Sequence, residues 1–138
     1  MDYYFRELGE VAYNFKMSRA GKVVARGTGF LPFNGVYTGI SDSISLSLNQ
    51  RNSNTDNGRA INISLYFAGY ETPGALGRRV LTSGLSYEEA LEELQSTDLV
   101  APCYYILGGK TEGSVITRER TEALLTRYID QYLQWYLV

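Results

Sequence analysis

Apolar and polar residues alternate along the first half of the chain, as they do in strands with one buried face. Residues 11–17 alternate in this way, and after a turn at 20–22 the run 23–30 returns as a second strand. A shorter candidate strand covers 36–40, and isoleucine and leucine alternate with serine over 43–49. These patterns predict an antiparallel sheet.

The pattern changes to that of helices after a polar loop at 49–58. The apolar stretch 60–67 is short, and a helix is the favoured interpretation. Pro73 suits the first turn of a helix over 73–82, with Gly84 just beyond its end. Ser86 and Glu89 have the spacing of a capping box, and an apolar stripe follows them. We therefore predict a further helix over 86–96.

The last third combines a hairpin signal with a helical one. An apolar run at 103–107, a glycine-bounded turn and a β-branched run at 115–117 predict a second hairpin. Apolar residues then recur at helical spacing through 121–138, which predicts an amphipathic helix. Such a helix needs a surface to pack on, and a membrane or a partner chain are the candidates. The predicted class is α+β.

The composition of the chain mainly excludes classes of function. The chain has 138 residues, a length typical of one domain, and its hydrophobic content of 44% suits a globular core. The net charge is −2 and no basic block occurs, so nothing indicates a nucleic-acid surface. We find no apolar run long enough to span a bilayer and no signal-peptide pattern at the N-terminus.

Residue types limit the chemistry further. The chain has no histidine, which excludes a Ser-His-Asp or Cys-His site and the usual histidine-bearing zinc sites within it. Cys103 is the single cysteine, lies in an apolar run without a neighbouring cation, and is predicted to be structural. Asn62 begins a glycosylation sequon, a weak signal that matters only in a secreted protein. These residues alone indicate no active site, no metal and no cofactor.

Several short motifs nonetheless occur in a recognisable order. They resemble those of acid ceramidase and its close relative N-acylethanolamine acid amidase, which are N-terminal-nucleophile hydrolases. The matching stretches are Met1-Asp2-Tyr3, Phe30-x-x-Phe33-x-Gly35-x-x-Thr38-Gly39, Ser-Leu-Ser-Leu-Asn-Gln-Arg at 45–51, Ser-Tyr-Glu-Glu-Ala at 86–90, Leu99-x-Ala101, Tyr-Tyr-Ile-Leu-Gly-Gly at 104–109 and Glu-Gly-Ser-Val-Ile-Thr-Arg-Glu-Arg at 112–120.

The resemblance implies a fold and a reaction. The fold would be part of a four-layer αββα sandwich. The reaction would be hydrolysis of the amide of ceramide or an N-acylethanolamine, through an N-terminal cysteine and without a cofactor, in the lysosome. Asp2 would orient the nucleophile. The acyl-binding cleft would be lined by Phe30, Phe33, Tyr37, Thr38 and Gln50.

The sequence also departs from the family. The nucleophilic cysteine and the arginine that precede the Met-Asp motif are not in this chain, and Gln50 replaces a glutamate. Residues 1–120 carry the resemblance, whereas 121–138 are interpreted as a divergent helical tail. We therefore expect a fragment of a lipid amidohydrolase that is inactive by itself. The alternative is a lipid-binding or regulatory protein derived from the family that performs no catalysis.

Overall fold

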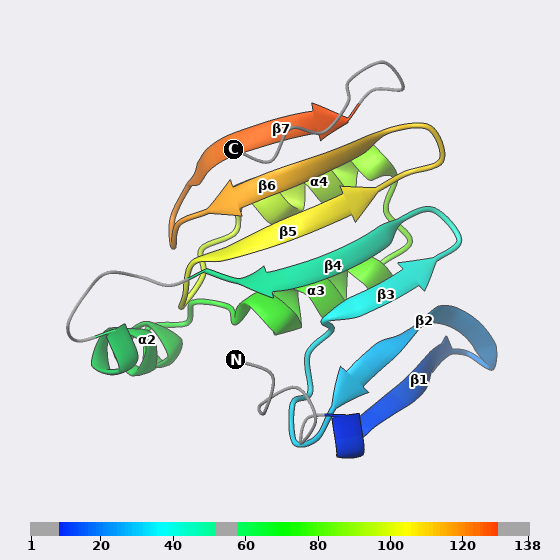
Figure 1. The fold of residues 1–138 in the computed structure, drawn as a ribbon, viewed down its shortest axis with the longest axis horizontal. Coiled ribbons are helices and arrows are strands. Elements are labelled where there is room, and N and C mark those ends of the chain that lie inside the picture. The colour runs from blue at the N-terminus through cyan, green and yellow to red at the C-terminus, as the bar shows by residue number, and fades with distance from the viewer. Residues whose placement is uncertain (1–8, 52–57, 130–138) are drawn as a thin grey trace.

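Seven antiparallel strands form one sheet whose spatial order is the order of the chain (Figure 1). The computed structural model describes residues 9–51 and 58–129. Each strand pairs with the next, so the sheet is a meander interrupted only by a helical insertion between β4 and β5. The strands are β1 (Ala12–Arg19), β2 (Lys22–Phe30), β3 (Thr38–Ser41), β4 (Ser45–Gln50), β5 (Cys103–Gly108), β6 (Gly113–Arg118) and β7 (Ala123–Ile129).

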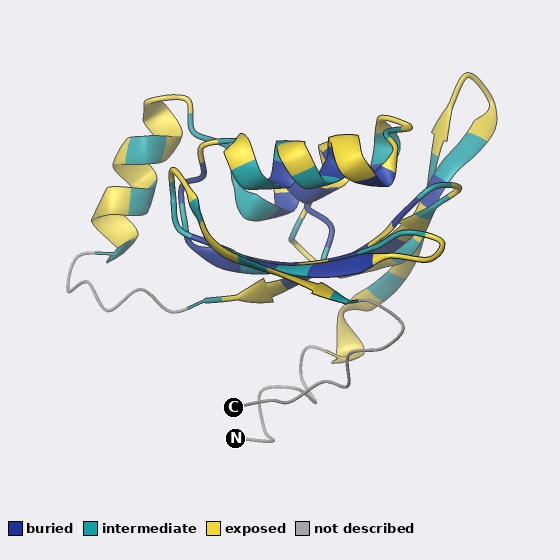
Figure 2. Cartoon of the chain, turned by 90° about the horizontal axis from the view of Figure 1, so that it is seen from above, coloured by how far each residue is buried: buried dark blue, intermediate teal, exposed yellow. Residues whose placement is uncertain are grey.

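The helical insertion covers one face of this sheet. It comprises α2 (Gly58–Phe67), α3 (Pro73–Thr82) and α4 (Tyr87–Ser96). Helices α3 and α4 lie across the sheet, whereas α2 stands at its side (Figures 1 and 2). The result is one helical layer on one sheet layer, which is half of the four-layer sandwich that the resemblance implies. No helix in the described ranges has the length and apolar character to cross a membrane.

Strand register decides which side chains reach the helices. Leu46 pairs with Leu107 and Leu48 with Tyr105, so these four side chains share the helix-covered face. They pack with Leu76, Val80 and Leu81 of α3 and with Ala90 and Leu94 of α4. The opposite face carries the alternate residues, and no described helix covers it (Figure 2). We call this second surface the open face.

The three helices predicted between residues 60 and 96 and both hairpins are confirmed. Ser86 caps α4: its Oγ accepts from the Glu89 amide at 3.3 Å and its own amide donates to the Glu89 carboxylate at 2.8 Å. Hydrogen bonds from the backbone and side chain of Ser86 to the ionised carboxylate lower the pKa of Glu89. Helix α3 begins with Pro73 as predicted, and Thr72 is its N-cap.

The helix predicted over 121–138 is wrong for residues 123–129. These residues form β7, which pairs antiparallel with β6, with Thr117 opposite Leu125 and Val115 opposite Arg127. Apolar residues in adjacent pairs fit a helical stripe, but the free edge of β6 offers unpaired backbone groups that only a strand can satisfy. Residues 130–138 lie outside the described ranges, and the division of the chain at residue 120 stays a prediction.

Candidate functional site

Three aromatic rings converge where β2 ends and β3 begins. The Tyr37 ring lies 4.5 Å from Phe30 and 4.5 Å from Phe33, measured between ring centroids. Two hydrogen bonds hold the end of the loop that presents them: the Val36 amide donates to the Gly74 carbonyl at 3.1 Å, and the Leu48 amide donates to the Tyr37 carbonyl at 2.7 Å. Burial raises the pKa of the Tyr37 phenol, so this ring stays neutral.

This aromatic cluster forms one wall of a cavity of about 210 Å³. The cavity lies where β4 ends, β5 begins and α3 starts. Its surface is largely apolar, which suits a hydrocarbon chain. The lining residues are Phe33, Tyr37, Leu48, Asn49, Gln50, Thr72, Pro73, Gly74, Ala101, Pro102 and Cys103.

Two glycines make room for the Phe33 ring. A Cβ on Gly35 or on Gly74 would collide with that ring, and the Cβ of Gly35 would also come within 2.7 Å of the Gly74 backbone. The loop and the first turn of α3 therefore approach each other closely because neither has a side chain at the contact. The close approach sets the position of Phe33 at the cavity.

Cys103 lines the cavity but is a poor nucleophile. It is 2% exposed, and burial raises the pKa of its thiol to about 11. The reactive form of cysteine is the thiolate, so this thiol is inert at neutral and acidic pH. The geometry agrees with the structural role predicted for it. Tyr105, next but one on β5, donates its hydroxyl to the Pro73 carbonyl at 2.8 Å and so ties the sheet to the start of α3.

The Arg-Glu-Arg run at 118–120 holds together the segments that surround the cavity. Arg118 is 0% exposed and donates to the Thr97 carbonyl, while Glu119 forms an ion pair with Arg51 just after β4. Arg120 donates to the Val100 carbonyl at 3.1 Å and to the Asn62 side chain at 3.0 Å. These residues hold the loop that leads into Ala101 and Pro102. Burial lowers the pKa of Arg118.

The structure brings together part of the predicted acyl-binding set. Phe33, Tyr37 and Gln50 line the cavity, and Phe30 joins them by stacking on Tyr37. Thr38 does not: its hydroxyl lies on the open face, 3.0 Å from that of Ser47. Thr38 is the first residue of β3 and pairs with Ser47, whose side chain points away from the helices, whereas Tyr37 precedes the strand and lies at the cavity with Pro73 and Gly74.

Two other predicted positions have different outcomes. Asp2 lies outside the described residues. Asn62 is half-buried in α2, where its side-chain oxygen accepts the bond from Arg120. Its glycosylation stays a prediction.

Sequence reasoning missed most of the cavity wall. The sequence places Pro73 at a helix start and Leu48 on the apolar side of a strand, and it indicates no role for Gly74 or Pro102, although all four line the cavity. No local sequence pattern marks these residues as part of a site, because the cavity forms only where four separate segments of the chain meet. Among the described residues, no group of three or more histidine, cysteine, aspartate or glutamate side chains is placed to hold a metal ion.

Comparison with known proteins identifies relatives of this arrangement. Acid ceramidase of Mus musculus is 40% identical over 139 aligned residues, and that of Homo sapiens is 37% identical over the same length. Each match takes in 96% of this chain and 35% of the relative, so the chain spans about a third of these proteins. No family model matches the chain.

A solved structure shares the fold. It is the Caenorhabditis elegans N-acylethanolamine-hydrolyzing acid amidase ortholog, with a TM-score of 0.78 and 29% identity over 94% of this chain and 57% of that one. Sequence and fold thus lead to the same relatives. Over nearly its whole length the chain is similar to one part of acid ceramidase and of the N-acylethanolamine-hydrolyzing acid amidase ortholog.

Proposed function

We propose that this chain forms the acyl-binding part of a lipid amidohydrolase, which converts ceramide or an N-acylethanolamine to a fatty acid and an amine. Similarity to acid ceramidase supports the reaction class. The observation that carries the proposal is the aromatic cavity, because Phe33 and Tyr37 present apolar ring surface at a pocket floored by Leu48. The lysosome is the proposed compartment.

The cavity would bury part of an acyl chain. Its apolar walls exclude water from the hydrocarbon, and the side chain of Gln50 offers an amide group at the end of β4. That amide suits the carbonyl end of the substrate, since an amide donates to a carbonyl oxygen and accepts from an N–H. Gln50 would therefore orient the substrate without adding a charge.

The nucleophile of the reaction is not Cys103. A buried thiol with a raised pKa cannot supply the thiolate that attacks the amide carbon. By resemblance, a cysteine outside this chain would form the acyl-enzyme, the amine would leave, and water would release the fatty acid. Asp2 would orient that cysteine. We expect no turnover by the 138-residue chain alone.

Acyl binding is testable with two phenylalanines. Phe33→Ala removes a ring that lines the cavity, whereas Phe67→Ala removes a ring that is 84% exposed on α2. Calorimetric titration with dodecanoate is expected to show roughly tenfold weaker binding for Phe33→Ala, because a buried ring contact is lost. Phe67→Ala should bind as the unmodified chain does. Equal affinity for all three proteins would rule out the cavity as the acyl site.

Hydrolysis is tested separately with a fluorogenic N-acyl amide. The chain alone should release no fluorophore above the rate in buffer. Turnover that survives Cys103→Ser would show a nucleophile we have not assigned, and turnover abolished by that change would overturn the argument from the buried thiol.

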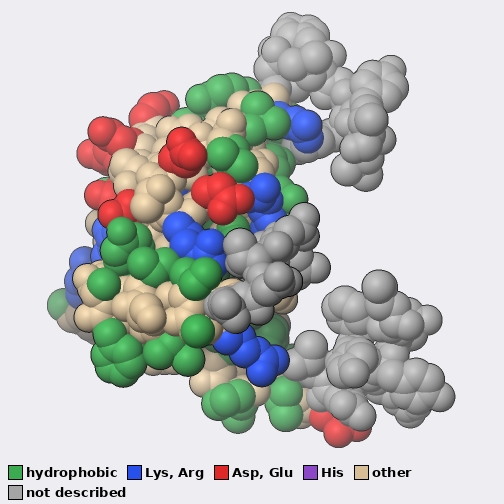
Figure 3. Space-filling view, turned by 90° about the vertical axis from the view of Figure 1, so that its left-hand side faces the viewer, with side chains coloured by type: hydrophobic (Ala, Val, Ile, Leu, Met, Phe, Trp, Pro, Cys, Tyr) green, Lys and Arg blue, Asp and Glu red, His purple; other side chains and the backbone are tan. Residues whose placement is uncertain are grey.

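A second candidate function is lipid binding without catalysis. Helix α2 favours it, because Ile63, Tyr66 and Phe67 are exposed and the helix carries Arg59 but no acidic residue. Figure 3 shows hydrophobic side chains exposed on the side of the molecule where α2 lies. A helix of this kind binds at a lipid surface. Binding to phosphatidylcholine vesicles that Phe67→Ser abolishes would support this candidate. The predicted membrane or partner contact through 121–138 loses its helical basis at 123–129.

A further inference from the structure

Two cations lie side by side on the open face. The register of β1 and β2 places Lys16 directly opposite Arg26, and both side chains are exposed. Like charges at directly opposed positions of a sheet destabilise it. Neither side chain forms an ion pair with any described residue. The pair is therefore available to an external anion.

Charge is segregated across the two layers of the molecule. None of the seven described strands contains an aspartate or a glutamate, whereas α4 contains four glutamates. Asp42, in the turn after β3, lies 4.0 Å from Lys22. An anion that approaches the described strands thus meets cations, and no carboxylate of those strands competes with it.

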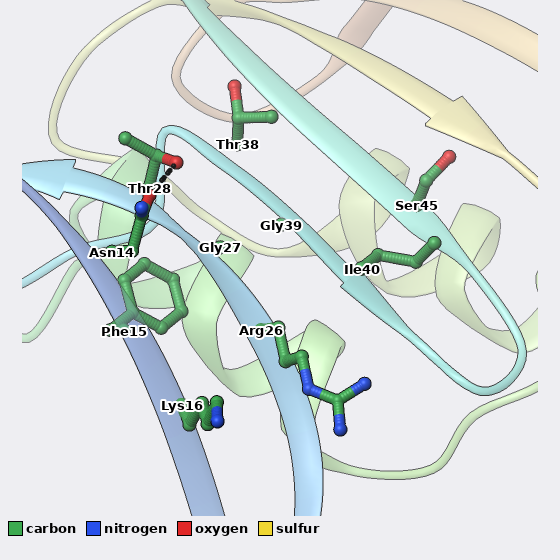
Figure 4. Close-up of a pocket in the computed structure, with 10 residues that line it drawn as sticks. All are labelled: Asn14, Phe15, Lys16, Arg26, Gly27, Thr28, Thr38, Gly39, Ile40 and Ser45. Carbon is green, nitrogen blue, oxygen red and sulfur yellow. Dashed lines mark hydrogen bonds between the residues drawn. The ribbon is translucent and has the colours of Figure 1, made fainter.

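The two cations border a recess of about 500 Å³ that is separate from the aromatic cavity (Figure 4). The rest of its surface is largely apolar, with Phe15, Gly27 and Gly39 in the lining, and a few hydroxyl and amide groups lie among these residues. Thr28 donates its hydroxyl to the Asn14 side chain at 2.9 Å, which leaves the Asn14 amide nitrogen free to donate. Thr38 and Ser45 add hydroxyls, and Ile40, which is 56% exposed, adds an apolar edge.

These groups match one class of ligand. An ammonium, a guanidinium, hydroxyls and an amide all donate hydrogen bonds, and several donors around one point suit the oxygens of a tetrahedral anion. We propose that the recess at Lys16 and Arg26 binds a phosphate-type oxyanion, either free or as the headgroup of an anionic lipid. The recess is larger than a phosphate ion, so an ester group fits beside it, and Ile40 would contact that group. The proposal does not depend on the acyl-binding function, because the sheet separates the two sites.

The test compares two double variants of the full chain. Lys16→Gln with Arg26→Gln removes the cations at the recess. Arg19→Gln with Lys22→Gln removes the same charge from the directly opposed pair at the hairpin end of the same strands. All four side chains are exposed, so both variants should fold, which circular dichroism checks.

Each protein is titrated with inorganic phosphate, and the chemical shifts of its backbone amides are measured by NMR. In a second assay each protein is mixed with vesicles of phosphatidylcholine with or without phosphatidylglycerol. Phosphate should shift the amides of Thr28 and Thr38, with roughly tenfold weaker affinity in the recess variant and no change in the hairpin-end variant. If the chain binds phosphatidylglycerol vesicles but not free phosphate, and only the recess variant loses this binding, the site is assigned to a lipid headgroup. Absence of binding in both arms, or equal losses in the two variants, would overturn the proposal.

Discussion

The hydroxyl of Tyr105 offers a direct measure of how strongly the sheet holds the start of α3. Tyr105→Phe removes its bond to the Pro73 carbonyl and leaves the fully buried ring in place. Loss of one buried hydrogen bond costs about 1–2 kcal/mol. The unfolding entropy of about 2.1 cal/mol/K per residue, taken over 138 residues, converts 1 kcal/mol to a shift of about 3–4 °C in Tm. We therefore expect Tm to fall by about 3–7 °C.

Differential scanning calorimetry at neutral pH measures this shift. Burial raises the pKa of Tyr105, so its phenol remains a neutral donor there and the effect should not vary between pH 5 and 8. Tyr128→Phe is the matched control, because this tyrosine is exposed on β7. An unchanged Tm for Tyr105→Phe, or an equal fall in both variants, would refute the view that this bond anchors α3.

Three further predictions concern single side chains. Gly74→Ala should lower the free energy of unfolding by about 1–3 kcal/mol in urea titrations, because its Cβ collides with Phe33; an unaffected variant would contradict the close approach. Burial raises the pKa of Cys103 from 9.0 to about 11. The neutral thiol therefore stabilises the folded state fully below pH 9, and this stabilisation is lost as the pH rises to 11. The unmodified chain should therefore lose about 2–3 kcal/mol more than Cys103→Ala over that interval, and parallel losses would argue against a buried thiol. Lys16→Gln should raise stability by about 0.2–1 kcal/mol at low salt through relief of its repulsion with Arg26, and a fall would argue against the register.

The candidate site shows how far a motif can be interpreted without a fold. Phe30, Phe33 and Tyr37 were identified because a resemblance pointed to their short segment, and they do cluster. Thr38 belongs to the same motif and was expected at the cleft by the same resemblance, yet strand geometry places its side chain on the other face. Neighbours in sequence share a site in a loop, but in a strand they are separated by the sheet.

The Arg-Glu-Arg run at 118–120 is a second example. As a motif it served only to indicate the family. In the structure its three side chains connect the end of β6 to the loop before β5, to Arg51 and to Asn62. Its role beside the cavity is to hold the surrounding segments in place, since none of the three side chains lines the cavity.

Local patterns in the sequence determined most of the secondary structure. The alternation of Ile44, Leu46 and Leu48 with serine, the capping box of Ser86 and Glu89, and Pro73 at a helix start all act within a few residues, so no distant partner is needed to interpret them. The two hairpins and the antiparallel sheet followed from the same signals. Resemblance added the family and the aromatic segment.

Tertiary contacts decided the rest. Residues 123–129 have apolar positions that suit either a helix or a strand, and the free edge of β6 selects the strand because its backbone groups require partners. The cavity exists only where β4, β5, the 31–37 loop and α3 meet, and the Lys16–Arg26 recess only where register places two strands side by side. Both sites depend on long-range pairing, and such pairing is set by the energy of the whole fold.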